Sequence, residues 1–333
     1  MSLPHRWLKI LALCIVTIIC IVTFYIWQIQ QEFFKKPLVQ TETIITLPKA
    51  SSARKLSEIL YTKGMIQSPK FFLGIIRYYQ LSSLLKSGSY LIQPHDTAIS
   101  LLHKIIQGRV YTVNLKMIEG QRLCEYLKEW SQSHEYQFQD SMLNDLQQGY
   151  ASLEGLFYPS TYIQPYGESI LPVLKLSRKK MDLTLNQIWQ TRDSDLPYKN
   201  SYELLIAASI IEKETAIDSE RRLISGVIIN RLRLKMPLQM DPTVVYGMPG
   251  CGHVILKGRD IKIDSPCNSY LHKGLPPTPI AMVSEASLQA AAHPQKTTYL
   301  YFVANGHGQH IFSVEYQQQK NAIAHIKREE NAN

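Results

Sequence analysis

The sequence predicts an α+β protein with an N-terminal transmembrane helix, a small α/β module and a larger mixed α+β domain. A segment of 18 uncharged residues, Ile10 to Trp27, is long enough to cross a bilayer. Patterns typical of short helices and strands alternate from residue 44 to 113, and longer helical patterns follow. With 333 residues, 45% of them apolar, the chain can form roughly two domains with separate cores.

The apolar segment is interpreted as an uncleaved membrane anchor, residues 10–27. Trp7 and Trp27 lie at its ends, where aromatic residues anchor membrane spans. A cleaved signal peptide is the alternative. Its apolar core would be shorter, and small residues at a cleavage site would follow.

Basic residues flank the span on both sides and bear on its orientation. Arg6 and Lys9 belong to a short head, residues 1–9, and positive charge favours the cytoplasmic side. Lys35 and Lys36 beyond the span argue the other way. We expect a cytoplasmic head and a body on the far side of the membrane.

A polar stalk and a compact module are predicted next, over residues 28–43 and 44–113. A stalk of 16 residues extends at most about 55 Å, so the body would work close to the membrane. Alternating and amphipathic patterns predict strands at "TIITLP", "KSGSYLIQP" and "VYTVNLKMIEG", and helices at "SARKLSEILYTKG", "SPKFFLGIIRYYQL" and "DTAISLLHKIIQG", the last capped by Asp96. The module has no obvious catalytic constellation, which favours a binding or spacer role.

A larger domain is predicted over residues 114–325, followed by a polar tail over 326–333 that is expected to fray. Its helices are expected at "RLCEYLKEW", from Glu168 to Trp189, at "YELLIAASIIEKET" and at "ERRLISGVIINRLRLKM", the last capped by Asp218 or Ser219. "YLYFV" is predicted to be a buried strand, and "ANGHGQ" a hairpin turn.

Charge and motifs exclude several classes of function. The net charge is +9, but the basic residues are scattered rather than interleaved with aromatic residues, so no nucleic-acid partner is expected. No phosphate-binding or dinucleotide-binding glycine motif occurs, and no cofactor is expected. Ser209 lies in a helical pattern without the sharp turn that a serine hydrolase nucleophile needs.

The chain has five cysteines, of which Cys14 and Cys20 lie in the span. The body therefore has Cys124, Cys251 and Cys267, an odd number that leaves no complete disulfide framework. Cys251 and Cys267 could form a disulfide or could remain free thiols, and the sequence does not decide between these alternatives.

Glu212 and Glu214 end an apolar helical run and at first suggest a carboxylate pair. Helical residues two apart point to nearly opposite sides, so at most one of them faces a given cleft. Glu214 follows the apolar face of Ile210 and Ile211, where desolvation would raise its pKa toward that of a general acid. A solvated helix end is the alternative.

Two further segments supply polar groups. In "LQMDPTVVYGM", Gln239 and Asp241 alternate with apolar residues, and with Tyr246 they offer hydrogen-bonding groups suited to sugar hydroxyls. The alternative there is a turn followed by a buried strand. The proline-rich stretch "DSPCNSYLHKGLPPTPI" is expected to be a stiff loop that holds Asn268 at a fixed geometry. His307 and His310 raise the question of zinc, but a third ligand at a familiar spacing is missing, and no metal is expected.

The order and content of these segments resemble the membrane-anchored endolytic murein transglycosylases, called MltG or YceG-like. The matching segments extend from residue 44 to 312 and are Glu119–Gly120, "LEGLFYPSTY", "AASIIEKETA", "ERRLISGVIINRLRLKMPLQMDPTVVYG", "GLPPTPI" and "AAAHPQKTTYLYFVANGHGQHIF". This chain departs from the family pattern at Met240, where the family often has threonine, at Cys267–Asn268–Ser269–Tyr270, where it often has Tyr-Asn-Thr-Tyr, and at Thr278, where it often has glycine.

The resemblance implies a function and a set of site residues. Such enzymes cut peptidoglycan glycan strands without water and leave a 1,6-anhydro-N-acetylmuramic acid end. It implies that Glu214 is the catalytic residue, first acid and then base, and that the substrate-binding residues are Glu154, Gln239, Asp241, Tyr246 and Asn268. It also implies that the small module is LysM-like.

The expected location is the bacterial inner membrane, with a single span and the body in the periplasm. The expected partners are nascent peptidoglycan glycan strands, the membrane and the penicillin-binding synthases that make the strands. The alternative function is a non-catalytic, membrane-anchored glycan-binding or assembly protein of the cell-wall synthesis machinery. A zinc hydrolase that uses His307 and His310 is a third hypothesis.

Overall fold

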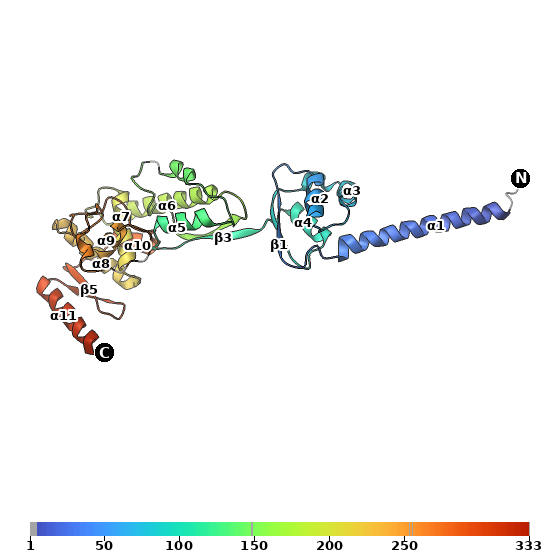
Figure 1. The fold of residues 1–333 in the computed structure, drawn as a ribbon. Helices are drawn as coiled ribbons and strands as arrows, with labels where there is room; N and C mark the ends of the chain where they lie inside the picture. Colours follow the sequence, from blue (N-terminus) through green and yellow to red (C-terminus); the bar gives the residue numbers. More distant parts are fainter. Residues whose placement is uncertain (1–4, 148, 253, 255, 333) are drawn as a thin grey trace. The chain divides into compact units, whose positions relative to one another are not determined.

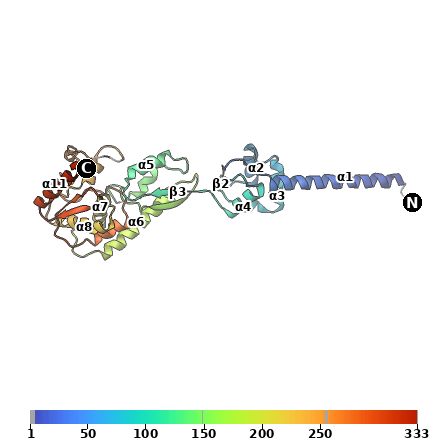
Figure 2. The ribbon, with the colours of Figure 1, turned by 90° about the horizontal axis from the view of Figure 1, so that it is seen from below.

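The structure, a computed structural model, describes residues 5–147, 149–252, 254 and 256–332 (Figures 1 and 2). The chain forms two compact units. One comprises Met1–Val113 with Pro165–Glu168, and the other comprises Asn114–Gln164 with Ser169–Asn333. The mixed helical and strand content confirms the predicted α+β class.

The first unit begins with α1 (His5–Gln30), the long apolar helix in blue in Figure 1. It is long and apolar enough to cross a membrane, and a signal sequence could have the same properties. Residues 1–4 of the predicted head lie outside the described residues. A short π-helix, η1 (Gln31–Lys35), continues from α1.

A two-stranded antiparallel sheet and several helices form the rest of this unit. Thr43 pairs with Ile92 and Leu47 with Gly88, so the strands are fully in register. Ser52, Ser68 and Thr97 each cap a helix by accepting a hydrogen bond from a backbone N–H, and Gly108 ends the last helix in the left-handed conformation. The elements are β1 (Thr43–Leu47), α2 (Ala53–Thr62), α3 (Pro69–Tyr78), η2 (Leu81–Leu84), β2 (Gly88–Ile92) and α4 (Ala98–Gln107).

The core of this unit includes part of the segment predicted as a stalk. Phe33 is 1% exposed and stacks on Phe72, with ring centroids 5.3 Å apart. Leu38 is also buried in this core, and Glu32 accepts a hydrogen bond from the Gln67 N–H at 2.8 Å. Residues 28–43 therefore contribute to the packing of the module, and only part of their length is available as a spacer.

The second unit centres on α7 (Ser201–Glu214), which is buried along most of its length. Helices α6 (Leu171–Thr191), α8 (Asp218–Arg233) and α10 (Glu285–Ala292) pack against it (Figures 1 and 2). The remaining elements are β3 (Thr112–Met117), α5 (Leu123–Gln132), η3 (Asp140–Leu146), β4 (Ser160–Pro165), α9 (Asp241–Gly247), η4 (Asp260–Lys262), β5 (Tyr301–Ala304), β6 (His310–Ser313) and α11 (Tyr316–Ala332). Strands β3 and β4 form one two-stranded sheet, and β5 and β6 form another.

Several local predictions need correction. Thr97 rather than Asp96 caps α4, and Ile217 occupies the N-cap position of α8 rather than Asp218 or Ser219. The strand considered after the Asp241 turn is the helix α9, because proline fits the first turn of a helix. Strand β5 is half-buried rather than buried, and the predicted tail is helical through Ala332, while Asn333 lies outside the described residues.

The cysteine pairing also differs from the pair considered from the sequence. Cys124, in the first turn of α5, forms a disulfide with Cys251, and their Cα atoms are 6.1 Å apart. Cys267 is a free, buried thiol. The bonded cysteines are 127 residues apart, so spacing along the chain could not identify them.

Candidate functional site

Helix α7 carries Glu214 at its C-terminal end. Asn200 caps the helix by accepting a hydrogen bond from the Glu203 N–H at 3.0 Å. Every residue from Leu204 to Ile211 is buried, so the apolar run fixes the helix in the core. The helix ends at Glu214 because Thr215 adopts an extended conformation.

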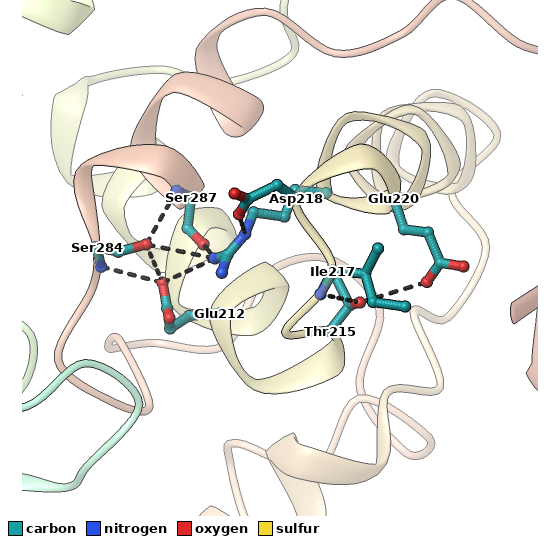
Figure 3. Close-up of polar contacts among 8 residues, drawn as sticks. Glu212, Thr215, Ile217, Asp218, Glu220, Ser284 and Ser287 are labelled. Atoms are coloured by element: carbon teal, nitrogen blue, oxygen red, sulfur yellow. Dashed lines mark hydrogen bonds and ion pairs between the residues drawn. The ribbon is translucent and has the colours of Figure 1, made fainter. Parts of the chain in front are cut away.

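Glu212 and Glu214 have different environments, as helical geometry predicts. Glu212 accepts hydrogen bonds from Arg221, at 3.3 Å, and from the backbone N–H of Ser284, at 3.0 Å (Figure 3). The hydroxyl groups of Ser284 and Ser287 complete this network around the Arg221 guanidinium. Glu212 is thus held in an ion pair with Arg221, and the prediction that the two glutamates point to different sides of the helix is confirmed.

Glu214 lines a cavity of about 500 Å³, here called the Glu214 cleft. The cleft walls come from the end of α7, from α8, from the segment before α9, and from β5, β6 and α11. Its polar lining residues are Glu214, Arg231, Gln239, Asp241, Tyr270, Tyr301, His310, Tyr316 and Gln319. Such a mixture of aromatic rings and hydrogen-bonding groups suits a ligand with both apolar faces and hydroxyls.

The Glu214 carboxyl lies in an environment that favours its protonated form. Its Oε1 atom is buried, and no hydrogen-bond donor among the described residues reaches it. Burial is the larger cause and the negative charge of Asp241 the smaller one, and together they raise the pKa of Glu214 from its ordinary value of 4.5 to about 8. At neutral pH this side chain can therefore donate a proton.

Gln239 lies in the Glu214 cleft and is held by its neighbours. Its side-chain oxygen accepts a hydrogen bond of 3.2 Å from Arg231, whose guanidinium also donates to the carbonyl groups of Pro237 and Leu238. Arg231 is 6% exposed and forms a cation–π contact with Tyr301. Gln239 has a positive φ of 53°, a left-handed conformation that is uncommon for a residue other than glycine.

Asp241 is the first residue of α9 and lines two cavities. One is the Glu214 cleft, and the other is a cavity of about 600 Å³, here called the Tyr246 cleft. Its Oδ1 atom accepts a hydrogen bond of 2.6 Å from the hydroxyl of Tyr270. The two cavities thus meet at the carboxylate whose charge acts on Glu214.

Tyr246 lies on α9 in the Tyr246 cleft rather than beside Glu214. Arg122 stacks over its ring at 4.7 Å and donates a hydrogen bond of 3.1 Å to its carbonyl. Burial raises the pKa of the Tyr246 hydroxyl to about 12, so the group stays protonated. Lys213 also lines this cleft and donates to the carbonyl of Gly120 at 2.9 Å.

Glu154 and Asn268, both predicted to bind substrate, are buried and line neither of these two cavities. Glu154 is 3% exposed and accepts a hydrogen bond from the Leu123 N–H at 2.9 Å. Burial raises its pKa to about 7, although that hydrogen bond and the charge of Arg122 oppose the shift. In this structure the carboxyl of Glu154 supports the start of α5.

Asn268 is fully buried and shapes the loop that carries Tyr270. Its amide nitrogen donates to the carbonyl groups of Ile261 and Ile263 at 3.0 and 2.8 Å. Its amide oxygen accepts from the Tyr270 N–H at 2.9 Å. All of these hydrogen bonds are internal, and one of them holds the backbone of Tyr270, which lines the Glu214 cleft.

The structure therefore brings three of the six predicted residues, Glu214, Gln239 and Asp241, into one cleft. It adds groups that the sequence did not single out for the site, above all Arg231 and the aromatic side chains of the C-terminal hairpin and α11. Tyr270, on the loop that was expected to be stiff, also lines this cleft. These residues are distant from Glu214 in the sequence, and only the tertiary fold brings them together. Among the described residues no group of three or more histidine, cysteine, aspartate or glutamate side chains could hold a metal ion.

Comparison with families of known proteins gives one match over most of the chain. The model of the YceG-like family matches residues 45–325. A YceG-like protein of Listeria monocytogenes, known from a crystal structure, is similar in fold, with a TM-score of 0.51 and 27% sequence identity. That alignment covers 85% of this chain and 99% of the Listeria chain.

Curated relatives are similar in sequence. The endolytic murein transglycosylase of Bacillus subtilis strain 168 is 30% identical over 312 residues, which cover 85% of this chain and 84% of that protein. The endolytic murein transglycosylase of Streptococcus pneumoniae D39 is 35% identical over 157 residues, which cover 46% of this chain and 28% of that protein.

Proposed function

This chain belongs to the YceG-like family, and we propose that it is a lytic transglycosylase that cuts the glycan strands of peptidoglycan. Relatives from two genera are named endolytic murein transglycosylases, which supports cleavage within a strand. The observation that carries the proposal is Glu214, a single carboxyl with a raised pKa in a cleft lined by aromatic and hydrogen-bonding side chains. These features suit acid–base chemistry on a sugar.

In the proposed reaction Glu214 acts first as an acid. Because its pKa is about 8, the carboxyl is protonated at neutral pH and can donate its proton to the glycosidic oxygen. The bond between this oxygen and the anomeric carbon of N-acetylmuramic acid then breaks. The leaving sugar keeps the proton as its new hydroxyl group.

Glu214 then acts as a base. Its carboxylate takes the proton from the 6-hydroxyl of the same muramic acid, and that oxygen bonds to the anomeric carbon. The product is a 1,6-anhydro end, and Glu214 is again protonated. An ordinary glycosidase needs a second carboxylate to activate water or attack the sugar, whereas here the substrate supplies the nucleophile. General acid–base assistance of this kind contributes about 10²–10⁴-fold to the rate.

The other cleft residues have supporting roles in this proposal. Gln239 and Asp241 hydrogen-bond the sugar at the cleavage site, and the charge of Asp241 stabilises the positive charge that develops on the ring. Tyr246 contacts a sugar farther along the strand, because it lines the adjoining cleft. Glu154 and Asn268 position the backbone beneath these contacts.

The N-terminal part of the chain suggests where this chemistry takes place. We propose that α1 anchors the protein in the bacterial inner membrane with the body in the periplasm, and that the small module is a LysM-like glycan-binding module. Because Phe33 and Leu38 pack into the module core, the module would lie close to the membrane and meet new strands beside the penicillin-binding synthases. A reporter enzyme that is active only outside the cytoplasm, fused after α11, should be active; an inactive, stably made fusion would contradict this orientation.

Isotope labelling distinguishes a lyase from a hydrolase. Purified peptidoglycan is digested with the full-length protein in detergent and water enriched in ¹⁸O, and the fragments are analysed by mass spectrometry. The proposal predicts anhydro ends without ¹⁸O, because water takes no part in the reaction. Reducing ends that carry ¹⁸O would show hydrolysis instead.

A further inference from the structure

A buried carboxylate, Glu220, holds the histidine that lines the Glu214 cleft. The Oε1 atom of Glu220 accepts a hydrogen bond from the backbone N–H of His310 at 2.9 Å. Its Oε2 atom lies 2.7 Å from Nδ1 of the His310 ring. The side chains are 11% and 10% exposed, so this double contact between α8 and β6 is largely shielded from solvent.

These contacts fix which nitrogen of His310 carries a proton. Burial alone would raise the pKa of Glu220, but the hydrogen bonds from His310 outweigh it and the pKa is lowered. Glu220 is therefore an ionised acceptor at neutral pH, and Nδ1 of His310 must be the donor.

The Nε2 atom of His310 has no hydrogen-bond partner in the part of the chain that the structure describes, although the residue lines the Glu214 cleft. The Phe302 ring meets the imidazole edge-on, with centroids 5.2 Å apart and an interplanar angle of 89°. Phe302 lines the same cleft. The imidazole is therefore restrained on one side by Glu220 and on another by an aromatic ring, so its orientation in the cleft is fixed.

Glu220 also holds the residue that follows Glu214. Its Oε2 atom accepts a hydrogen bond from the hydroxyl of Thr215 at 3.3 Å, and this hydroxyl accepts one from the Ile217 N–H at 3.0 Å (Figure 3). One carboxylate thus fixes both the end of α7 and His310. The geometry couples the position of the proposed catalytic group to that of the histidine.

We propose that His310 is a substrate-binding residue of the Glu214 cleft, whose Nε2 atom forms a hydrogen bond with a sugar hydroxyl, and that Glu220 is its positioning residue. This inference rests on the proposed function, since it names a contact to the same glycan. It assigns a role in the cleft to a histidine that the sequence suggested only as a zinc ligand or as a polar group at the start of a strand.

Two substitutions of His310 separate the contact with the glycan from the contact with Glu220. In His310→Asn, the amide nitrogen can take the place of Nδ1 and keep the bond to Glu220, while nothing replaces Nε2. In His310→Gln, the longer side chain can place its amide group near Nε2, while the donor to Glu220 is lost. The full-length variants are compared with wild type in detergent by thermal unfolding and by the rate of anhydro-end formation.

The inference predicts that the variant with the higher Tm is the one with the lower activity. His310→Asn should keep a Tm near that of wild type but lose kcat/KM by roughly 3–10-fold, as expected for one lost hydrogen bond. His310→Gln should melt at a lower temperature and yet be the more active of the two. If His310→Asn is as active as wild type, or if His310→Gln is no more active than His310→Asn, the inference is wrong.

The wild-type protein and Glu214→Gln, assayed in parallel, show which idea has failed. If wild type produces no anhydro ends, the proposed function falls, and this inference falls with it. If wild type is active, Glu214→Gln is inactive and His310→Asn matches wild type, only the role of His310 is refuted.

Discussion

The hydroxyl of Tyr270 donates a 2.6 Å hydrogen bond to Oδ1 of Asp241. Tyr270 lies on the loop that Asn268 holds from within, and Asp241 begins α9. The backbone of the two segments is also joined, because the Gln239 N–H donates to the Ser269 carbonyl at 3.0 Å. The loop therefore sets the position of the carboxylate that raises the pKa of Glu214.

Replacing Tyr270 by phenylalanine tests this relationship. Tyr270→Phe keeps the ring but leaves Asp241 without its donor, so we expect kcat/KM to fall by roughly 3–10-fold. The Tm should change little, because the hydroxyl bonds to an exposed carboxylate. Tyr78→Phe is a matched control, since Tyr78 is 81% exposed in the first unit. Equal activity of both variants would show that the contact has no functional role.

The rate of anhydro-end formation should depend on pH through Glu214. The acid must be protonated, so kcat/KM should be constant below its pKa of about 8 and fall as the pH rises above it. The negative charge of Asp241 contributes to the raised pKa, so Asp241→Asn should move this alkaline limb to lower pH. The pH–rate profile measures both effects.

Asp264→Asn is the control for that shift, because the Asp264 side chain is 96% exposed and lines neither cleft. Its profile should coincide with that of wild type. An alkaline limb that stays in place in Asp241→Asn would contradict the coupling between Asp241 and Glu214.

The raised pKa of Glu214 should also affect how protein stability depends on pH, which can be measured without an activity assay. The pKa of Glu214 is about 8 in the folded protein and near 4.5 when unfolded, so the folded state holds the extra proton between these values. Stability should therefore fall as the pH rises from about 4.5 to 8 and then remain low. Glu214→Gln has no ionisable group at this position, so its stability should not show this fall.

Thermal unfolding of wild type and Glu214→Gln at several pH values checks the sign. The variant should gain in Tm relative to wild type from pH 5 to pH 9, by several degrees if the penalty is about 1–2 kcal/mol. A constant difference between the two proteins across this range would mean that Glu214 titrates normally.

The Cys124–Cys251 disulfide should stabilise the second unit. It joins the start of α5 to the segment after α9 and closes a loop of 127 residues, for which a stabilisation of about 2–4 kcal/mol is typical. Reductant should therefore lower the Tm of wild type but not that of Cys124→Ser. Cys267→Ser should respond to reductant as wild type does, because Cys267 is free. A wild-type Tm that does not change on full reduction would contradict this role.

Patterns local in sequence were predicted well. The helix that ends at Glu214, the helix that ends at Gly108 and the strand β1 follow from apolar periodicity and stop signals, and the structure confirms them. The opposite directions of Glu212 and Glu214 follow from helical geometry alone. In these cases the information lies within a few residues.

Features that depend on distant contacts were not predicted. The sequence places Phe33 in a polar stalk, whereas in the structure Phe33 packs against the rings of Phe71 and Phe72 in α3. The partner of Cys251 is Cys124 rather than the nearer Cys267, because tertiary packing brings α5 to the segment after α9. The orientation of the His310 ring depends on Glu220, which is 90 residues away.

The candidate site also has residues that were predicted from the sequence and others whose surroundings were not. The sequence resemblance pointed to Glu214, Gln239 and Asp241, and the structure places all three in one cleft. The resemblance also pointed to Glu154 and Asn268, yet Glu154 accepts a hydrogen bond from the Leu123 N–H and interacts with Tyr246, and the Asn268 amide bonds to backbone groups inside the protein. Residue type alone could not separate a side chain that faces a cleft from one that supports it.

The central claim is that Glu214 supplies the proton for glycan cleavage, and product analysis with Glu214→Gln tests it most directly. Full-length wild type, Glu214→Gln and Glu212→Gln are incubated with purified peptidoglycan, and anhydro ends are counted by mass spectrometry. We predict that anhydro ends form with wild type, that Glu212→Gln retains activity in proportion to its folded fraction, and that a folded Glu214→Gln forms essentially none. Anhydro ends released by Glu214→Gln at the wild-type rate would contradict the account.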